Sequence, residues 1–253
     1  MKTAVITGAA QGLGLVAARR FAALGYRAVL IDLQSPETAA DGIGPDAIAL
    51  TGDISDEQFV ADCAARIAAD FGGADVLVNN AGVSLIEPAE STSLAQWQRV
   101  MAINLAGPFL LCRAFGGQML ARGEGAIVNV ASVAGLGGVI HRSAYNASKH
   151  GLIGLTKTLA AEWGGRGVRV NAVCPGWIKT EMDAQDMGSG AYSDRDIINR
   201  VPMARFAQPG DVAEAIVFLA SDGAGFINGV CLPVDGGWSG DMSWDALRLK
   251  TRG

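Results

Sequence analysis

Ser132, Tyr145 and Lys149 are the residues whose types and spacing favour acid–base chemistry on an alcohol. Tyr145 and Lys149 are four positions apart, so on a helix their side chains share one face. A phenol with a pKa near ~10 is a poor base at neutral pH, but a neighbouring ammonium group favours the phenolate. The hydroxyl of Ser132 can donate a hydrogen bond to a substrate oxygen or accept one. Together these residues predict a general base that removes the proton of an alcohol.

Each of these residues also has a purely structural interpretation. Ser132 could form a turn at the end of a strand, and Tyr145 could be a core aromatic residue whose hydroxyl is satisfied. Asn104, a further candidate, could cap a helix. The catalytic interpretation therefore depends on all four residues occurring together in a chain of suitable architecture.

A glycine-rich turn near the N-terminus predicts a site for phosphate groups. Residues 3–7 form an apolar run typical of a buried strand, and the apolar stripe that starts at Leu13 has helical spacing. Gly8, Gly12 and Gly14 lie at the junction of the two. Backbone amides at the N-terminus of such a helix bind pyrophosphate, so the turn favours a dinucleotide ligand.

Asp32 at the end of the second expected strand predicts which dinucleotide is used. Asp32 follows Gly14, the last glycine of the turn, by 18 residues. This is close to the ~20-residue spacing at which a carboxylate accepts hydrogen bonds from the hydroxyls of an adenosine ribose. It could alternatively be a turn aspartate. A carboxylate there repels the additional phosphate of NADP⁺, and residues 10, 11, 33 and 34 include no lysine or arginine to offset that repulsion. The pattern favours NAD as the cofactor.

Strands and helices are expected to alternate along the whole chain. Branched apolar runs typical of buried strands cover residues 3–7, 27–31, 47–50, 76–78, 126–130, 168–173 and 230–234. Helical spacing between them predicts an α/β fold: a single-domain, Rossmann-like, doubly wound parallel sheet with helices on both faces, formed by residues 1–253. The alternation is lost at residues 180–201, which we expect to form a substrate loop, and in the C-terminal tail, residues 238–253.

Composition and charge argue against several classes of function. Glycine accounts for 34 of 253 residues, about twice the usual ~7%, which indicates close backbone approach. The net charge of −5 argues against nucleic-acid binding, which typically requires an excess of positive charge. We find no apolar run of the ~18 residues that a membrane span needs and no secretory signal, so we expect a cytoplasmic protein without a membrane partner. The scattered cysteines and two histidines favour free thiols and no metal site.

The spacing of the glycines and the residues that follow resemble the short-chain dehydrogenase/reductase family. The match is close and covers nearly the whole chain, and its motifs lie between Gly8 and Thr180. The matching positions are Gly8, Gln11, Gly12, Leu13 and Gly14, then Asp53 and Ile54, Asn80, Ala81 and Gly82, Asn104, Ser132, Tyr145 and Lys149, Pro175 and Gly176, and Ile178 and Thr180.

The resemblance implies a role for each group of residues. Asp53 and Ile54 would contact the adenine ring, residues 80–82 the adenosine ribose, and Ile178 and Thr180 the nicotinamide carboxamide. Pro175 and Gly176 also belong to the implied cofactor site. Tyr145 and Lys149 would serve both catalysis and cofactor binding. Asn104 would hold a water molecule that links Lys149 to solvent.

The predicted function is NAD-dependent hydride transfer between a secondary alcohol and nicotinamide, with Tyr145 as general base. An alternative within the family is an NADPH-dependent 3-oxoacyl-carrier-protein reductase, although the basic residue typical of that branch is missing at Gln11 and Leu33. A non-catalytic, dinucleotide-sensing protein is the alternative from another class. The family also implies a homo-oligomer, a homotetramer or a dimer, formed through helices at residues 97–121 and 152–159.

The substrate is expected to be a small polar molecule, such as a sugar, polyol or hydroxy acid. The loop at residues 180–201 is rich in polar side chains, and His141 and Arg142 closely precede Tyr145. Polar groups in a pocket need polar partners. The opposing interpretation is a solvated loop face with Arg142 in a surface ion pair.

Overall fold

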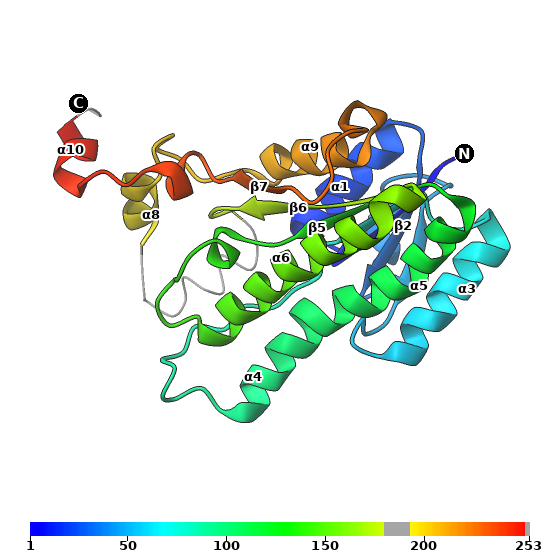
Figure 1. The fold of residues 1–253 in the computed structure, drawn as a ribbon, viewed down its shortest axis with the longest axis horizontal. Coiled ribbons are helices and arrows are strands. Elements are labelled where there is room, and N and C mark those ends of the chain that lie inside the picture. The colour runs from blue at the N-terminus through cyan, green and yellow to red at the C-terminus, as the bar shows by residue number, and fades with distance from the viewer. Residues whose placement is uncertain (180–192, 251–253) are drawn as a thin grey trace.

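The computed structural model describes residues 1–179 and 193–250. Within these residues the strands form a seven-stranded parallel sheet in the order β3-β2-β1-β4-β5-β6-β7 (Figure 1). The strands are β1 (Thr3–Thr7), β2 (Arg27–Asp32), β3 (Ile48–Thr51), β4 (Val76–Asn79), β5 (Gly125–Val130), β6 (Val168–Pro175) and β7 (Cys231–Val234). The chain winds outward from β1 to β3 and then returns to β4 beside β1. This reversal opens a crevice at the carboxyl ends of β1 and β4.

Helices cover both faces of the sheet, as the sequence predicts (Figure 1). One face carries α1 (Gly12–Ala23) and α9 (Pro209–Ala220), and the other carries α3 (Glu57–Phe71), α5 (Gly107–Arg122) and α6 (Ser143–Trp163). Shorter helices are α2 (Glu37–Asp41), α4 (Leu94–Met101), α8 (Asp194–Arg200) and α10 (Asp245–Lys250). The doubly wound fold is therefore confirmed.

The core lies in two layers, one on each side of the sheet. In β1, Ala4 and Ile6 pack towards α1 and α9, whereas Val5 between them packs against the opposite layer with Phe115 of α5. All four side chains are fully buried. This explains why the strands are apolar at consecutive positions rather than at alternate ones. The four cysteines are free thiols, as predicted, and only Cys231 is partly exposed.

The helical region expected at residues 97–121 is longer and less regular than predicted. Helix α4 continues through a π-helical turn, η1 (Ala102–Ala106), directly into α5. The resulting helix, Leu94–Arg122, is long and apolar enough to cross a membrane by length and composition alone. The sequence analysis did not identify this stretch, because polar and charged residues such as Arg99 and Arg113 interrupt its apolar residues. Leu111 and Met119 of α5 are fully buried in the protein core, as in the central helix of a globular protein.

Only part of each irregular segment lies among the described residues. The predicted substrate loop contributes α8, which Ser193 caps by accepting a hydrogen bond from the amide of Asp196. Thr180 and the rest of that loop up to residue 192 lie outside the described residues. In the tail, Trp244 and Met242 are 78% and 98% exposed, whereas Arg248 is largely buried. The described part of the tail is therefore packed on one side and exposed on the other.

The turn after β1 packs against the end of β4 with no space for additional side chains. The Asn80 side chain donates to the carbonyl oxygens of Thr7 and Gly8 at 2.9 and 3.0 Å. The Thr7 hydroxyl accepts from the amides of Asn80 and Ala81 at 3.1 and 3.0 Å. A Cβ atom on Gly14 would lie only 2.1 Å from the carbonyl oxygen of Gly8. Glycine at this position is therefore a requirement of close backbone packing.

We predict that Gly14→Ala destabilises the fold and weakens dinucleotide binding, because the new methyl group must displace the Gly8 carbonyl. The expected loss of unfolding free energy is about 1–3 kcal/mol, the usual cost of overpacking. The matched control is Gly210→Ala at the start of α9, where a Cβ meets no atom within 4 Å. Chemical denaturation of both variants tests the difference. Equal stabilities would show that the turn can relax.

Candidate active site

A cleft of about 680 Å³ opens at the carboxyl ends of the strands. Its walls bring together residues that are far apart in the chain. The predicted site residues that line it are Gly8, Gln11, Gly12, Leu13, Asp32, Asp53, Ile54, Asn80, Ala81, Gly82, Ser132, Tyr145, Lys149, Pro175, Gly176 and Ile178. Gly14 and Asn104 lie behind this wall, and Thr180 falls outside the described residues.

The first turn of α1 faces this cleft with its backbone amides available. Gln11 is the N-cap residue, but its side chain makes no capping hydrogen bond. Gly8 and Gly12 adopt positive φ angles of 64° and 57°, which let the backbone turn sharply into the helix. The first amides of a helix have no partners within it and carry partial positive charge. This end of the cleft therefore fits the pyrophosphate of a dinucleotide.

The Asp32 carboxylate shapes the same end of the cleft. One oxygen accepts from the amide of Ala10 at 2.9 Å, and the other accepts from the amide of Gln34 at 3.0 Å. Asp32 thus holds the glycine turn against the end of β2, a structural contact that the sequence did not reveal. A carboxylate has about four acceptor positions, so its lining position still allows bonds to ribose hydroxyls. No lysine or arginine from the described residues lines the cleft between residues 8 and 55.

Ser132, Tyr145 and Lys149 form the opposite part of the lining. The Lys149 ammonium nitrogen lies 5.6 Å from the centre of the Tyr145 ring and donates to the Val130 carbonyl oxygen at 2.8 Å. Ser132 follows β5 and its hydroxyl accepts from the amide of Ala134 at 3.1 Å. That bond occupies an acceptor position and leaves the hydroxyl proton for another partner.

Burial lowers the pKa of Lys149 from 10.5 to about 8. The side chain is only 4% exposed, so the charged form loses most of its hydration. Its hydrogen bond to the Val130 carbonyl recovers part of that loss. At neutral pH the residue is still mainly a cation, and its nitrogen lies beside the Tyr145 ring.

Asn104 braces the wall of the cleft from behind. Its side chain accepts from the amide of Val83 at 2.9 Å and donates to the Val83 carbonyl oxygen at 2.9 Å. It also donates to the Ser148 hydroxyl at 3.2 Å. Asn104 lies in the π-helical turn between α4 and α5, which interrupts the regular helix at this position. These contacts join the loop after β4 to the helix that carries Tyr145 and Lys149.

Several lining residues were not among the predicted catalytic and cofactor-binding residues. They include Arg99, Val139, Arg142 and Trp177. Arg142 lies near the Tyr145 ring, at 5.8 Å from its centre, and donates to the Ser84 hydroxyl at 2.7 Å. Its proximity to Tyr145 in the sequence was the available signal. Trp177 follows Gly176 directly, but nothing in its local pattern separates it from a core aromatic residue.

Comparisons with known proteins agree with this geometry. A family model described as enoyl-(acyl carrier protein) reductase matches residues 8–239. D-threitol dehydrogenase of Mycolicibacterium smegmatis is 45% identical over 243 residues, covering 94% of this chain and 93% of the relative. Galactitol 2-dehydrogenase (L-tagatose-forming) of Cereibacter sphaeroides is 41% identical over 243 residues, covering 93% of this chain and 94% of the relative.

A solved structure extends the comparison to three dimensions. It is described as an NAD(P)-dependent gluconate 5-dehydrogenase from Beutenbergia cavernae with NADP bound at low occupancy. The TM-score is 0.88 at 41% sequence identity, and the match covers 95% of this chain and 97% of the other. The likeness therefore includes the strands and loops that form the cleft.

We predict that the buried Lys149 makes stability depend on pH. Its pKa in the folded protein, about 8, lies below the ordinary 10.5, so between these values the unfolded chain binds more protons and stability rises with pH. Relative to Lys149→Met, the wild type should gain ~3 kcal/mol between pH 8 and pH 10.5. Lys157→Met, which alters an exposed lysine of the same helix, is the control. Urea unfolding across this range that shows parallel profiles for wild type and Lys149→Met would contradict the burial argument.

Proposed function

Since the chain belongs to the short-chain dehydrogenase/reductase family, whose members among its relatives are dehydrogenases of CH–OH groups, we propose that it oxidises a secondary alcohol with NAD⁺. The observation that carries the proposal is a single cleft lined by the glycine turn, Asp32 and the Ser132, Tyr145 and Lys149 group. A phosphate-binding end and an acid–base end in one cavity are what hydride transfer to a dinucleotide requires.

The cofactor is proposed to lie along the cleft from the glycine turn to Tyr145. The amides at the start of α1 hold the pyrophosphate, and Asp32 accepts hydrogen bonds from the adenosine ribose. Asp53 and Ile54 contact the adenine, residues 80–82 its ribose, and the segment from Pro175 to Ile178 the nicotinamide. When bound, nicotinamide supplies the hydride acceptor.

Tyr145 is proposed to take the proton of the alcohol. The Lys149 cation favours the phenolate form, because opposite charges lower the pKa of an acid. Ser132 donates a hydrogen bond to the substrate oxygen and so directs the hydroxyl towards Tyr145. Asn104 fixes the position of the Val83 loop relative to the helix that carries Tyr145, through its hydrogen bonds with Val83 and Ser148.

The proposed substrate class is a polyol or sugar. D-threitol and galactitol are the substrates named for two relatives. Arg142 supplies hydrogen-bond donors to this part of the cleft, which suits several hydroxyl groups or a carboxylate. A 3-oxoacyl-carrier-protein reductase is the alternative that a substrate comparison must exclude.

The homo-oligomer and the cytoplasmic location stay predictions. The apolar side chains of Leu94 in α4 and Phe109 in α5 are exposed, and such a surface could take part in assembly.

We predict that Tyr145→Phe lowers kcat for alcohol oxidation by at least ~10²-fold, because the variant keeps the ring but loses the base. The measurement follows reduced nicotinamide with D-threitol, galactitol and, in the reverse direction, an acetoacetyl thioester. Binding of NAD⁺ to the variant, measured by calorimetry, controls for folding. Wild-type turnover of the thioester alone would favour the reductase, and full activity in the variant would remove Tyr145 as the base.

We predict that NAD⁺ is preferred over NADP⁺ by at least tenfold in kcat/KM, because the Asp32 charge repels the additional phosphate. Asp32→Asn keeps one acceptor oxygen, for the Ala10 amide of the glycine turn, but loses the acceptor of the Gln34 amide and the charge, so it should admit NADP⁺ and narrow the preference. Steady-state rates with both cofactors measure this. Equal use of NADP⁺ by the wild type would contradict the assignment. An unchanged preference in Asp32→Asn would show that the loop contacts, and not the charge, select the cofactor.

A further inference from the structure

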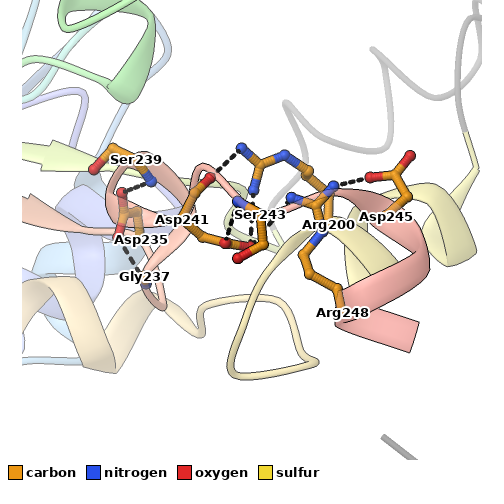
Figure 2. A network of polar contacts seen from close by, with 8 residues as sticks. All are labelled: Arg200, Asp235, Gly237, Ser239, Asp241, Ser243, Asp245 and Arg248. Carbon is orange, nitrogen blue, oxygen red and sulfur yellow. Dashed lines mark hydrogen bonds and ion pairs between the residues drawn. The ribbon is translucent and has the colours of Figure 1, made fainter. Parts of the chain in front are cut away.

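Ion pairs that meet at Asp241 join the C-terminal tail to helix α8 (Figure 2). The Asp241 carboxylate lies 3.1 Å from Nη1 of Arg248 and 3.7 Å from Nη1 of Arg200. Nη2 of Arg200 also donates to the backbone carbonyl of Asp241 at 3.1 Å. Arg200 ends α8 and Arg248 belongs to α10, so one carboxylate holds two helices together. We call Arg200, Asp241 and Arg248 the tail clamp.

Two members of the tail clamp are better shielded from water than an ordinary surface ion pair, whereas the side chain of the third, Arg200, is 35% exposed. The side chains of Asp241 and Arg248 are 14% and 10% exposed, whereas the partner of Arg248 within α10, Asp245, is 83% exposed. Hydrogen bonds from Ser243, together with Arg248, lower the pKa of Asp241 to about 2, so the carboxylate is ionised at neutral pH. Removing its charge would leave two guanidinium groups facing each other without a shared partner, which is costly at shielded positions.

Two tryptophans connect the tail clamp to the cleft. The Arg200 guanidinium lies 5.0 Å from the centre of the Trp238 ring, and the Trp238 and Trp177 rings meet edge to face at 5.2 Å. Trp177 lines the cleft. Both kinds of contact depend on ring orientation, so a displacement of Arg200 is transmitted to the cleft wall.

Backbone pairing joins this wall to Ala207, and an apolar cluster joins it to α8. Ala207 donates its amide to the Trp177 carbonyl at 2.9 Å and accepts from the Lys179 amide at 3.1 Å. Ile197 of α8 and Phe206 are buried in the same apolar cluster as Trp177. The tail clamp, through Arg200, is therefore in contact with the helix that packs on this wall.

We propose that Asp241 is a positioning residue for the substrate: through Arg200 and Trp238 it sets the place of Trp177 in the cleft wall. The inference rests on the proposed function, in that the cleft near Tyr145 receives the alcohol. Asp241 itself touches neither substrate nor reacting atoms. Its role is to fix the width and shape of the space beside Trp177, and hence the fit of a polyol chain extending from the reacting carbon.

The effect should concern the substrate more than the cofactor. Trp177 and Trp238 follow β6 and β7, at one edge of the sheet, whereas the glycine turn and Asp32 follow β1 and β2 on the other side of the crevice. The segment proposed to contact the nicotinamide, Pro175 to Ile178, includes Trp177, but the surface proposed to hold the pyrophosphate and the adenosine is independent of the tail clamp.

The first test compares Asp241→Asn with Asp245→Asn, since both remove an acidic partner of Arg248 but only Asp241 also holds Arg200. With D-threitol and NAD⁺, Asp241→Asn should raise the KM for the alcohol at least threefold while the KM for NAD⁺ changes less than twofold. Asp245→Asn should leave both constants within twofold. Adding Arg248→Gln to Asp241→Asn removes the repulsion between the guanidinium groups of Arg200 and Arg248. The KM for the alcohol should then fall part of the way back to the wild-type value.

The second test does not depend on turnover. Hydrogen–deuterium exchange of Asp241→Asn without ligands should be at least threefold faster in peptides covering residues 177–179 and 194–207, with no change in residues 8–14. Unaltered exchange at residues 177–179, or an equal rise in the NAD⁺ KM, would overturn the proposal. If the wild type oxidises no alcohol, the proposed function fails, and the exchange measurement still decides whether the tail clamp positions Trp177.

Discussion

Contact between the backbones at the ends of β1 and β4 is the constraint on which the cleft depends. The Asn80 side chain bonds to the carbonyl oxygens of Thr7 and Gly8, and the Thr7 hydroxyl accepts two amides in return. Gly14 packs on the Gly8 carbonyl with no space for a side chain. Because the strand order reverses here, tying these two ends together orients the α1 amides towards the space between them.

The acid–base end of the cleft depends on an unfavourable burial. Lys149 is buried, so its charged form loses hydration, which lowers its pKa to about 8. The hydrogen bond to Val130 partly compensates for that loss, and Tyr145 lies close to the charge. The contacts of Asn104 with Val83 and Ser148 keep the surrounding elements in place. Burial of Lys149 thus lowers the stability of the fold, while in the proposed mechanism its charge favours the phenolate form of Tyr145.

Local patterns in the sequence were enough to predict the sheet, its helices and most of the cleft lining. Apolar runs mark strands buried on both faces, and residues at the ends of those strands necessarily meet at one edge. Contacts that depend on tertiary packing could not be predicted: the Ala10 amide bonded to Asp32, the π-helical turn at Asn104, and the pairing of Arg200 with Arg248 through Asp241. No periodicity distinguishes the apolar helix Leu94–Arg122 from a membrane span, since burial alone separates the two.

The central claim, that this cleft transfers hydride from a carbinol carbon to NAD⁺, can be tested by isotope transfer. D-threitol deuterated at its two secondary carbinol carbons is incubated with the protein and NAD⁺, and the reduced cofactor is analysed by mass spectrometry. The account predicts one deuterium atom in each molecule of reduced nicotinamide and a slower rate than with unlabelled substrate. Reduced nicotinamide without deuterium, or no reduction with any secondary alcohol tested in the same way, would contradict it.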